Sequence, residues 1–224
     1  MKKYQLEIAC FNLESAIIAQ ENGADRVEFC ANMKEGGTTP DFETTKSVRE
    51  ELSVALYVMI RPRGGNFVYS DAEFEQMKSE INQFKKIQVD GFVFGILNED
   101  GSVNKVQNTE LIALANPLPC TFHRAFDVVD NVVQSLEDSI SCGFKTILTS
   151  GQGKNVVDGI GILAKLVEKA KDRIAIMPGS GLRSSNINLL KTKTNAAFYH
   201  SSAIIDGTET ANGDEVKLLK ANLQ

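Results

Sequence analysis

The sequence predicts an α/β fold, a single (β/α)₈ barrel of the TIM type spanning residues 1–224. Short apolar runs alternate with amphipathic helical stretches, about eight such units follow one another, and no linker or low-complexity segment interrupts them. The length is at the small end of the range for this fold. An open, doubly wound sheet is the alternative, but the segment ACFNLES after the first strand lacks a glycine-rich dinucleotide turn.

Each unit pairs a β-prone run with a helical stretch. The runs are apolar on both faces, which is typical of parallel strands covered by helices. The expected strands are 4–9, 26–30, 54–60, 91–96, 120–123, 145–150, 173–177 and 196–202. The expected helices are 13–22, 38–52, 70–87, 105–115, 129–141, 156–170 and 184–191.

Local signals indicate where several helices begin and end. Thr39 suits the N-cap of the second helix because Pro40 would then occupy its first turn. Ser70 and Glu73 have the spacing of a capping box at the start of the third helix. Gly143 is placed to end the fifth helix.

Composition narrows the function classes. The chain has 42% hydrophobic and 24% charged residues and a net charge of −5, without a Lys/Arg-rich run, so we expect no nucleic-acid partner. No apolar run approaches the roughly 20 residues of a membrane helix, and the start MKKYQLEIAC does not resemble a signal peptide. We therefore expect a cytoplasmic protein without a membrane partner, whose four widely spaced cysteines are free thiols.

Polar residues follow or end several of the expected strands, where barrel enzymes carry their chemistry. Both histidines of the chain are among them, and His123 in TFHRAFD is the best candidate for proton transfer or metal ligation. An alternative is that these charges only neutralise one another, because charges inside a barrel must be paired. The candidate catalytic residues are Glu7, Glu28, His123, Asp127 and His200.

A second group of residues predicts a site for a small anion, phosphate or carboxylate. Two arginines flank a proline and precede two glycines in IRPRGGNFVYS, and the MPGSGL loop lies where many barrels hold a phosphate. The candidate anion-binding residues are Arg61, Arg63, Arg124, Ser150, Gly179 and Gly181. The absence of lysine at the strand ends disfavours a Schiff-base aldolase.

Seven segments, spread over nearly the whole chain, resemble the signature segments of the CutC copper-homeostasis family. They are, in order, GADRVEFCANMKEGGTTP, VMIRPRGGNFVYSD, GFVFGILNEDG, TFHRAFD, ILTSG, IMPGSG and HSSA. The resemblance implies a (β/α)₈ barrel, a cytoplasmic location and a homo-oligomer, a dimer or a tetramer. It also implies a role in copper homeostasis, with Cu(I) bound by two cysteines on the first two strands.

This chain departs from that pattern at the first cysteine. The family position falls on Ala9, whereas the second falls on Cys30, which is present. Cys10 comes one residue later, so its side chain should point to the opposite face of the strand. Because Cu(I) prefers soft sulfur ligands, a single thiol predicts weak binding.

Three functions remain open from the sequence. The first is copper homeostasis, with Cu(I) as the metal. The second is a small-molecule barrel enzyme that acts on a phosphate- or carboxylate-bearing substrate by acid/base or metal-assisted chemistry. The third is a non-catalytic oligomeric scaffold.

Overall fold

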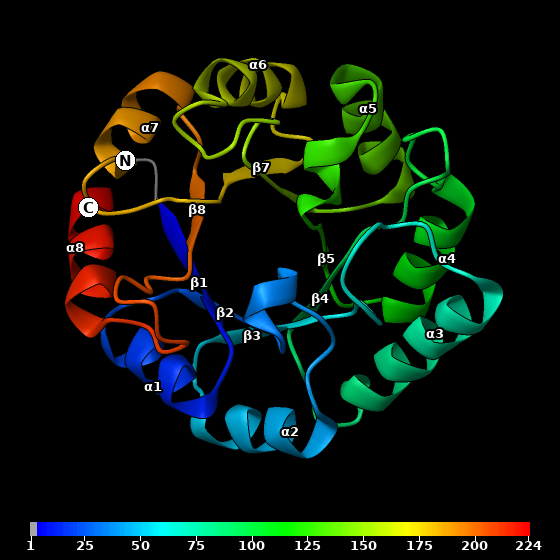
Figure 1. Ribbon diagram of the computed structural model, residues 1–224, viewed down its shortest axis with the longest axis horizontal. Coiled ribbons are helices and arrows are strands. Elements are labelled where there is room, and N and C mark those ends of the chain that lie inside the picture. Colours follow the sequence, from blue (N-terminus) through cyan, green and yellow to red (C-terminus); the bar gives the residue numbers. More distant parts are fainter. Residues whose placement is uncertain (1–3) are drawn as a thin grey trace.

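The computed structural model describes residues 4–224 and confirms the (β/α)₈ barrel (Figure 1). The strands are β1 (Gln5–Cys10), β2 (Arg26–Phe29), β3 (Ala55–Met59), β4 (Gly91–Phe94), β5 (Cys120–Phe122), β6 (Thr146–Thr149), β7 (Ala175–Pro178) and β8 (Phe198–Ser201). Neighbouring strands pair in parallel, in the order β7-β6-β5-β4-β3-β2-β1-β8. β7 and β8 lie beside each other and complete the ring, although no ladder joins them in residues 4–224.

Helices form the outer ring in Figure 1. They are α1 (Leu13–Glu21), α2 (Phe42–Glu51), α3 (Asp71–Lys85), α4 (Lys105–Ala115), α5 (Val132–Cys142), α6 (Ile160–Ala170), α7 (Ile187–Thr194) and α8 (Gly213–Leu223), with the 3₁₀ helices η1 (Met33–Glu35) and η2 (Arg124–Val128). The sequence did not indicate α8. The helix expected from residue 129 begins at Val132, because η2 and the Asn131 cap precede it. None of these helices is both long and apolar enough to cross a bilayer.

The helix caps show where local signals succeed and fail. The capping box at Ser70 and Glu73 is confirmed, since each side chain bonds the other residue's backbone N–H. The expected N-cap at Thr39 is wrong. Asp41 caps α2 by accepting the Thr44 N–H at 2.9 Å, whereas the Thr39 hydroxyl donates to Glu80 at 2.8 Å. Aspartate is the stronger cap because its charge also favours a helix N-terminus.

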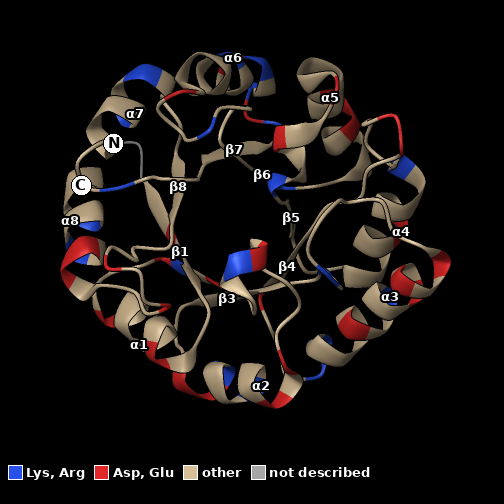
Figure 2. Cartoon of the chain, in the orientation of Figure 1, with Lys and Arg blue, Asp and Glu red and all other residues tan. Residues whose placement is uncertain are grey.

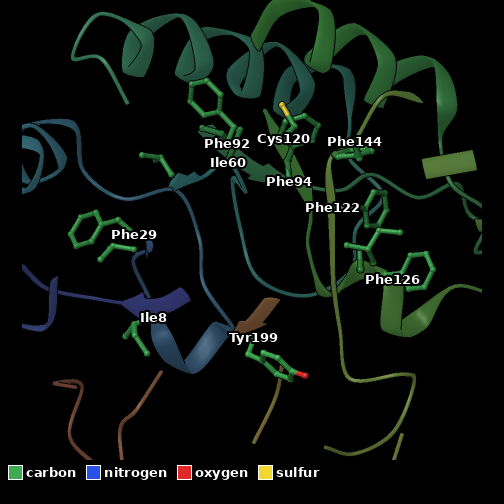
Figure 3. Close-up of a cluster of buried hydrophobic side chains, with 14 of the residues drawn as sticks. Ile8, Phe29, Ile60, Phe92, Phe94, Cys120, Phe122, Phe126, Phe144 and Tyr199 are labelled. Carbon is green, nitrogen blue, oxygen red and sulfur yellow. The ribbon is translucent and has the colours of Figure 1, made fainter. Parts of the chain in front are cut away.

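The main apolar core lies between the strands and the helices (Figure 3). Alternate strand residues point outward into it, and the Phe144 ring lies 5.2 Å from Phe94 and 5.0 Å from Phe122, measured between centroids. Burying a side chain of this size stabilises the fold by about 1.5–3 kcal/mol. Because successive strand residues face opposite sides, the intervening residues point into the barrel. That inner face is where the charged strand residues Glu7, Arg26 and Glu28 lie.

Candidate functional site

A cavity of about 410 Å³ opens at the carboxyl ends of the strands. The short helix η1, which lies inside the ring of helices in Figure 1, contributes Met33 and Glu35 to the cavity wall, and Figure 2 shows that it carries both basic and acidic residues. Eight of the residues singled out from the sequence line the cavity: Glu28, Cys30, Arg61, His123, Arg124, Asp127, Gly181 and His200. Its size and its mixed polar and apolar wall suit a small organic ligand.

Glu7 lies below the cavity rather than in its wall. It is fully buried, and its carboxylate bonds the Arg26 guanidinium on one oxygen and the Nδ1 atom of His200, at 2.7 Å, on the other. The Arg26 guanidinium also lies 3.9 Å from the ring centroid of Tyr57 and 4.2 Å from that of Phe198. Sequence reasoning missed Arg26. No sequence signal indicates it, because the parallel register that sets it opposite Glu7 is known only from the structure.

Glu28 and His200 form a second carboxylate–imidazole pair, and both line the cavity. The Glu28 Oε2 atom lies 4.0 Å from His200 Nε2, and the Glu28 Oε1 atom is buried without a hydrogen-bond partner in the described chain. Burial raises the pKa of Glu28 to about 7, against the attraction of the His200 charge. Burial alone would lower the pKa of His200, but the charges of Glu28 and Glu7 outweigh it and raise that pKa.

The pKa of Glu7 shifts the other way. Its burial favours the neutral carboxyl, but the Arg26 charge and the His200 hydrogen bond outweigh that effect and lower the pKa. Glu7 is therefore the fixed negative charge of the site. Glu28, whose pKa is raised to about 7, can exchange a proton near neutral pH, as acid/base groups do.

Cys30 faces the cavity and Cys10 does not, as the strand alternation predicts. Cys10 packs in the core outside the barrel, and Ala9 takes the place in the cavity wall. The Cys30 thiol donates to Glu28 Oε2 at 3.5 Å, and burial together with the Glu28 charge raises its pKa well above the usual value. Cys30 packs against Met59, whose side chain also lines the cavity.

His123 presents one ring nitrogen to the cavity as a hydrogen-bond donor. Its Nδ1 atom accepts the Ala125 N–H at 3.2 Å, which places the proton of the neutral ring on Nε2. That Nε2 atom is buried and has no partner among residues 4–224. Burial, with the nearby charge of Arg61, lowers the pKa of His123 to about 3. The ring is therefore neutral at physiological pH and is a weak base there.

The two arginines of the IRPRGG segment bind backbone carbonyls. Arg61 is buried and donates to the carbonyls of Glu35, Gly37 and Gly65, each within 3.0 Å. It is not the counter-ion of the buried glutamates, since Arg26 has that role for Glu7. Arg63 does not line the cavity. It pairs with Glu73 and holds loop carbonyls instead.

Asp127 organises the loop after β6. Its Oδ1 atom accepts the Thr149 hydroxyl at 2.5 Å and the Ser150 N–H at 2.8 Å, and its Oδ2 atom pairs with Arg124 at 2.8 Å. The Ser150 hydroxyl is buried and donates to the Gly153 carbonyl, outside the cavity. These contacts give Asp127 and Ser150 a role in loop structure, and Asp127 also lines the cavity.

The MPGSGL loop adds unpaired backbone donors to the cavity. Ser180 has a φ of +89°, which a serine seldom adopts, and the Gly181 that follows it also has a positive φ, +70°. The N–H groups of Ser180 and Gly181 donate to no residue in 4–224. Gly179 packs tightly against Leu148 and His200, so a side chain there would collide with them.

Arg183, which sequence reasoning missed, lies next to this loop and lines the cavity. It donates to the carbonyls of Leu182 and Ile204 and to the Ser201 hydroxyl. No described carboxylate lies within ion-pair distance of it. Its charge is therefore free to attract an anion.

Comparison with known proteins gives a consistent result. The model of the CutC family matches residues 4–205. A human protein named copper homeostasis protein cutC homolog is 42% identical over 89% of this chain and 73% of its own length. A CutC family protein of Chromobacterium violaceum is 43% identical over 88% of this chain and 80% of its own.

A solved structure supports the same assignment. The crystal structure of a CutC protein from Streptococcus agalactiae superposes with a TM-score of 0.85 at 32% identity, covering 89% of this chain and 98% of that one. Family match, sequence identity and shared fold therefore coincide over most of the chain, and the chain belongs to the CutC family.

Proposed function

We propose that this chain acts in copper homeostasis by binding Cu(I) at the mouth of its barrel. Relatives at about 42% identity carry that role in their names. The observation that carries the proposal is the pairing of two soft donors, the Cys30 thiol and the Met59 thioether, in the cavity wall. Both side chains lie beside Gly37. A Cβ atom placed on that glycine would lie 3.4 Å from the Cys30 sulfur and 3.5 Å from the terminal methyl of Met59. Cu(I) prefers thiolate and thioether ligands.

The same geometry limits the affinity. Cys10 points away from the cavity, so Cys30 is the single thiol that lines it in the described chain. Since burial and Glu28 raise the pKa of Cys30, Cu(I) must also displace a proton from the thiol. We propose further that the protein works in the cytoplasm, where the cysteines stay reduced, as a dimer or a tetramer.

Competition with a Cu(I) chelator tests the copper site. Cys30→Ser should weaken binding about tenfold or more, and Ala9→Cys should strengthen it by a similar factor because it adds a second thiol to the wall. Cys10→Ser is the matched control and should change little. Tight binding that survives Cys30→Ser would contradict this site.

A second candidate function is catalysis on a small anionic substrate. Arg183 and the free N–H groups of Ser180 and Gly181 gather at one side of the cavity. Glu28, with a pKa raised to about 7, and His200 border the same space. Cationic and N–H donors beside an acid/base pair suit a substrate that carries phosphate or carboxylate.

Calorimetry with inorganic phosphate tests that anion site. We expect binding, and Arg183→Gln should weaken it about tenfold, since a charge-assisted contact to the anion is lost. Arg173→Gln, an exposed arginine paired with Glu137 far from the cavity wall, is the control and should leave binding unchanged. If neither phosphate nor a small carboxylate binds at millimolar concentration, the enzyme candidate loses its substrate site.

A further inference from the structure

We propose that Glu28, Cys30 and His200 form a site for a divalent transition metal of the zinc class, and that Glu7 positions His200 for it. The site differs from the Cu(I) site in its donors, because it uses the carboxylate and the imidazole in place of the Met59 thioether. The two share Cys30. The proposal therefore goes beyond the copper function and does not depend on it.

The orientation of His200 is the first observation. Its Nδ1 atom is engaged by Glu7 Oε1 at 2.7 Å, which leaves the Nε2 atom directed toward Glu28. A carboxylate on the far nitrogen of a histidine is the usual support of a metal-bound imidazole, because it fixes the tautomer and strengthens the donor. A Glu7 oxygen lies within 4.8 Å of the ligand atoms of Glu28 and His200, but both Glu7 oxygens are already bonded, one to His200 and one to Arg26, so Glu7 supports the site without being a ligand.

The spacing of the three donor atoms is the second observation. Glu28 Oε2 lies 4.0 Å from His200 Nε2 and 3.5 Å from Cys30 Sγ. Tetrahedral ligand atoms about 2.1 Å from one zinc ion lie about 3.4 Å apart. The Glu28–Cys30 separation is already close to this value, whereas the carboxylate and the imidazole must approach by roughly 0.6 Å, which side-chain rotation can supply.

Glu28 supplies the third observation. Glu28 is buried, with 3% of its surface exposed, and its Oε1 atom has no hydrogen-bond partner in residues 4–224. An unpaired carboxylate oxygen in the interior costs free energy unless something binds it. A metal ion held by both carboxylate oxygens of Glu28 would satisfy this atom as well as use Oε2.

The charges around the site balance with a divalent ion. The Glu28 carboxylate and the Cys30 thiolate together carry two negative charges, which one divalent cation neutralises. The Glu7 charge is already matched by Arg26, so a neutral His200 completes a site without net charge. One thiolate, one imidazole and one carboxylate are typical zinc ligands, whereas Mg²⁺ and Ca²⁺ take oxygen ligands.

The site would keep an open position. All three donors line the cavity, so the ion would face the space where a small ligand binds. Three protein ligands and one exchangeable position are the arrangement of catalytic zinc sites, whereas structural sites use four protein ligands. The inference thus also supplies a metal for the anionic substrate of the second candidate function.

Titration of the metal-free protein with Co²⁺, a spectroscopic probe for zinc sites, tests the proposal. We expect one equivalent to bind, with visible bands of a four-coordinate ion and a thiolate-to-cobalt charge-transfer band. Cys30→Ser should remove the charge-transfer band. His200→Gln and Glu28→Gln should each weaken Co²⁺ binding about tenfold or more, and Zn²⁺ should displace the Co²⁺. The control Cys10→Ser should leave both spectrum and affinity unchanged.

The outcomes separate this site from the copper site. Met59→Leu should weaken Cu(I) binding and leave the Co²⁺ spectrum intact. His200→Gln should weaken Co²⁺ binding and leave the Cu(I) affinity unchanged. Thermal unfolding checks that each variant is folded. Because His200→Gln and Glu28→Gln each test a ligand independently, misfolding of one variant would not by itself account for weaker Co²⁺ binding in both. Absence of a charge-transfer band in the folded wild-type protein, or its persistence in Cys30→Ser, would overturn the metal site while leaving Cu(I) binding to its own test.

Discussion

Replacing Glu7 by glutamine is expected to lower the free energy of unfolding by about 3–5 kcal/mol, the range found when one partner of a buried ion pair is removed. Arg26 is 7% exposed, and Glu7 is its one acidic partner in the described chain. The substitution leaves that charge buried without compensation, and it also removes the negative partner of His200. Urea unfolding of the metal-free protein at pH 7 measures the effect.

Two further variants make this test specific. Glu137→Gln breaks an exposed ion pair with Arg173 and should change the stability little, because water screens that pair. In a double-mutant cycle, Arg26→Met combined with Glu7→Gln should recover part of the loss, since no uncompensated buried arginine remains. A loss for Glu7→Gln no larger than that for Glu137→Gln would contradict the proposed role of this ion pair.

The fold could be predicted because its signal repeats. Apolar runs alternate with amphipathic helices eight times, so an error in one unit does not change the architecture. The errors occur where a single residue decides. Thr39 with Pro40 was a plausible helix start, but Asp41 provides the better cap and α2 begins after it. The last helix, α8, was missed although Val216, Leu219 and Leu223 have helical spacing and Asn212 caps its start.

The candidate site was predictable only in part. The position of Glu28, His123 and His200 at strand ends follows from the topology, and the structure brings them around one cavity. Depth and pairing follow from the strand register, which the sequence does not contain. The register places Glu7 below the cavity and sets Arg26 opposite it. Because the register could not be derived from the sequence, this buried ion pair was not predicted.

Loop geometry accounts for the remaining differences. Arg61, predicted as an anion ligand, lines the cavity, and its guanidinium also binds carbonyls of the surrounding loops, which the sequence did not indicate. Arg183 had no sequence signal, since its place in the cavity depends on the path of the loop after β7. Backbone conformations of this kind, such as the positive φ of Ser180, depend on tertiary context.

Replacing His123 by asparagine should reduce the sensitivity of the protein to acid. Burial and Arg61 lower the pKa of His123 from 6.5 to about 3 in the folded state. The unfolded chain therefore binds a proton that the folded protein rejects between these pH values. The stability from this group is fully present above the unfolded pKa and is lost as the pH falls toward the folded pKa. From pH 7 to pH 4 this loss is about 3 kcal/mol. Asparagine does not titrate, and its carbonyl can still accept the Ala125 N–H.

Unfolding free energies of both proteins, measured by urea at several pH values, give the test. The difference in free energy of unfolding between wild type and His123→Asn contains a constant packing cost and a pH-dependent part, and only the pH-dependent part reports the titration. This part should shift by about 3 kcal/mol in favour of the variant as the pH falls from 7 to 4. Acid groups such as Glu7 titrate in both proteins and cancel in the difference.

Thr121→Val, a buried non-titrating change on the same strand segment, is the control and should differ from wild type by an amount independent of pH. A pH-independent difference for His123→Asn as well would show that this ring titrates normally. His123 would then be able to take up a proton near neutral pH, and its assignment as a neutral hydrogen-bond donor in the cavity would be wrong.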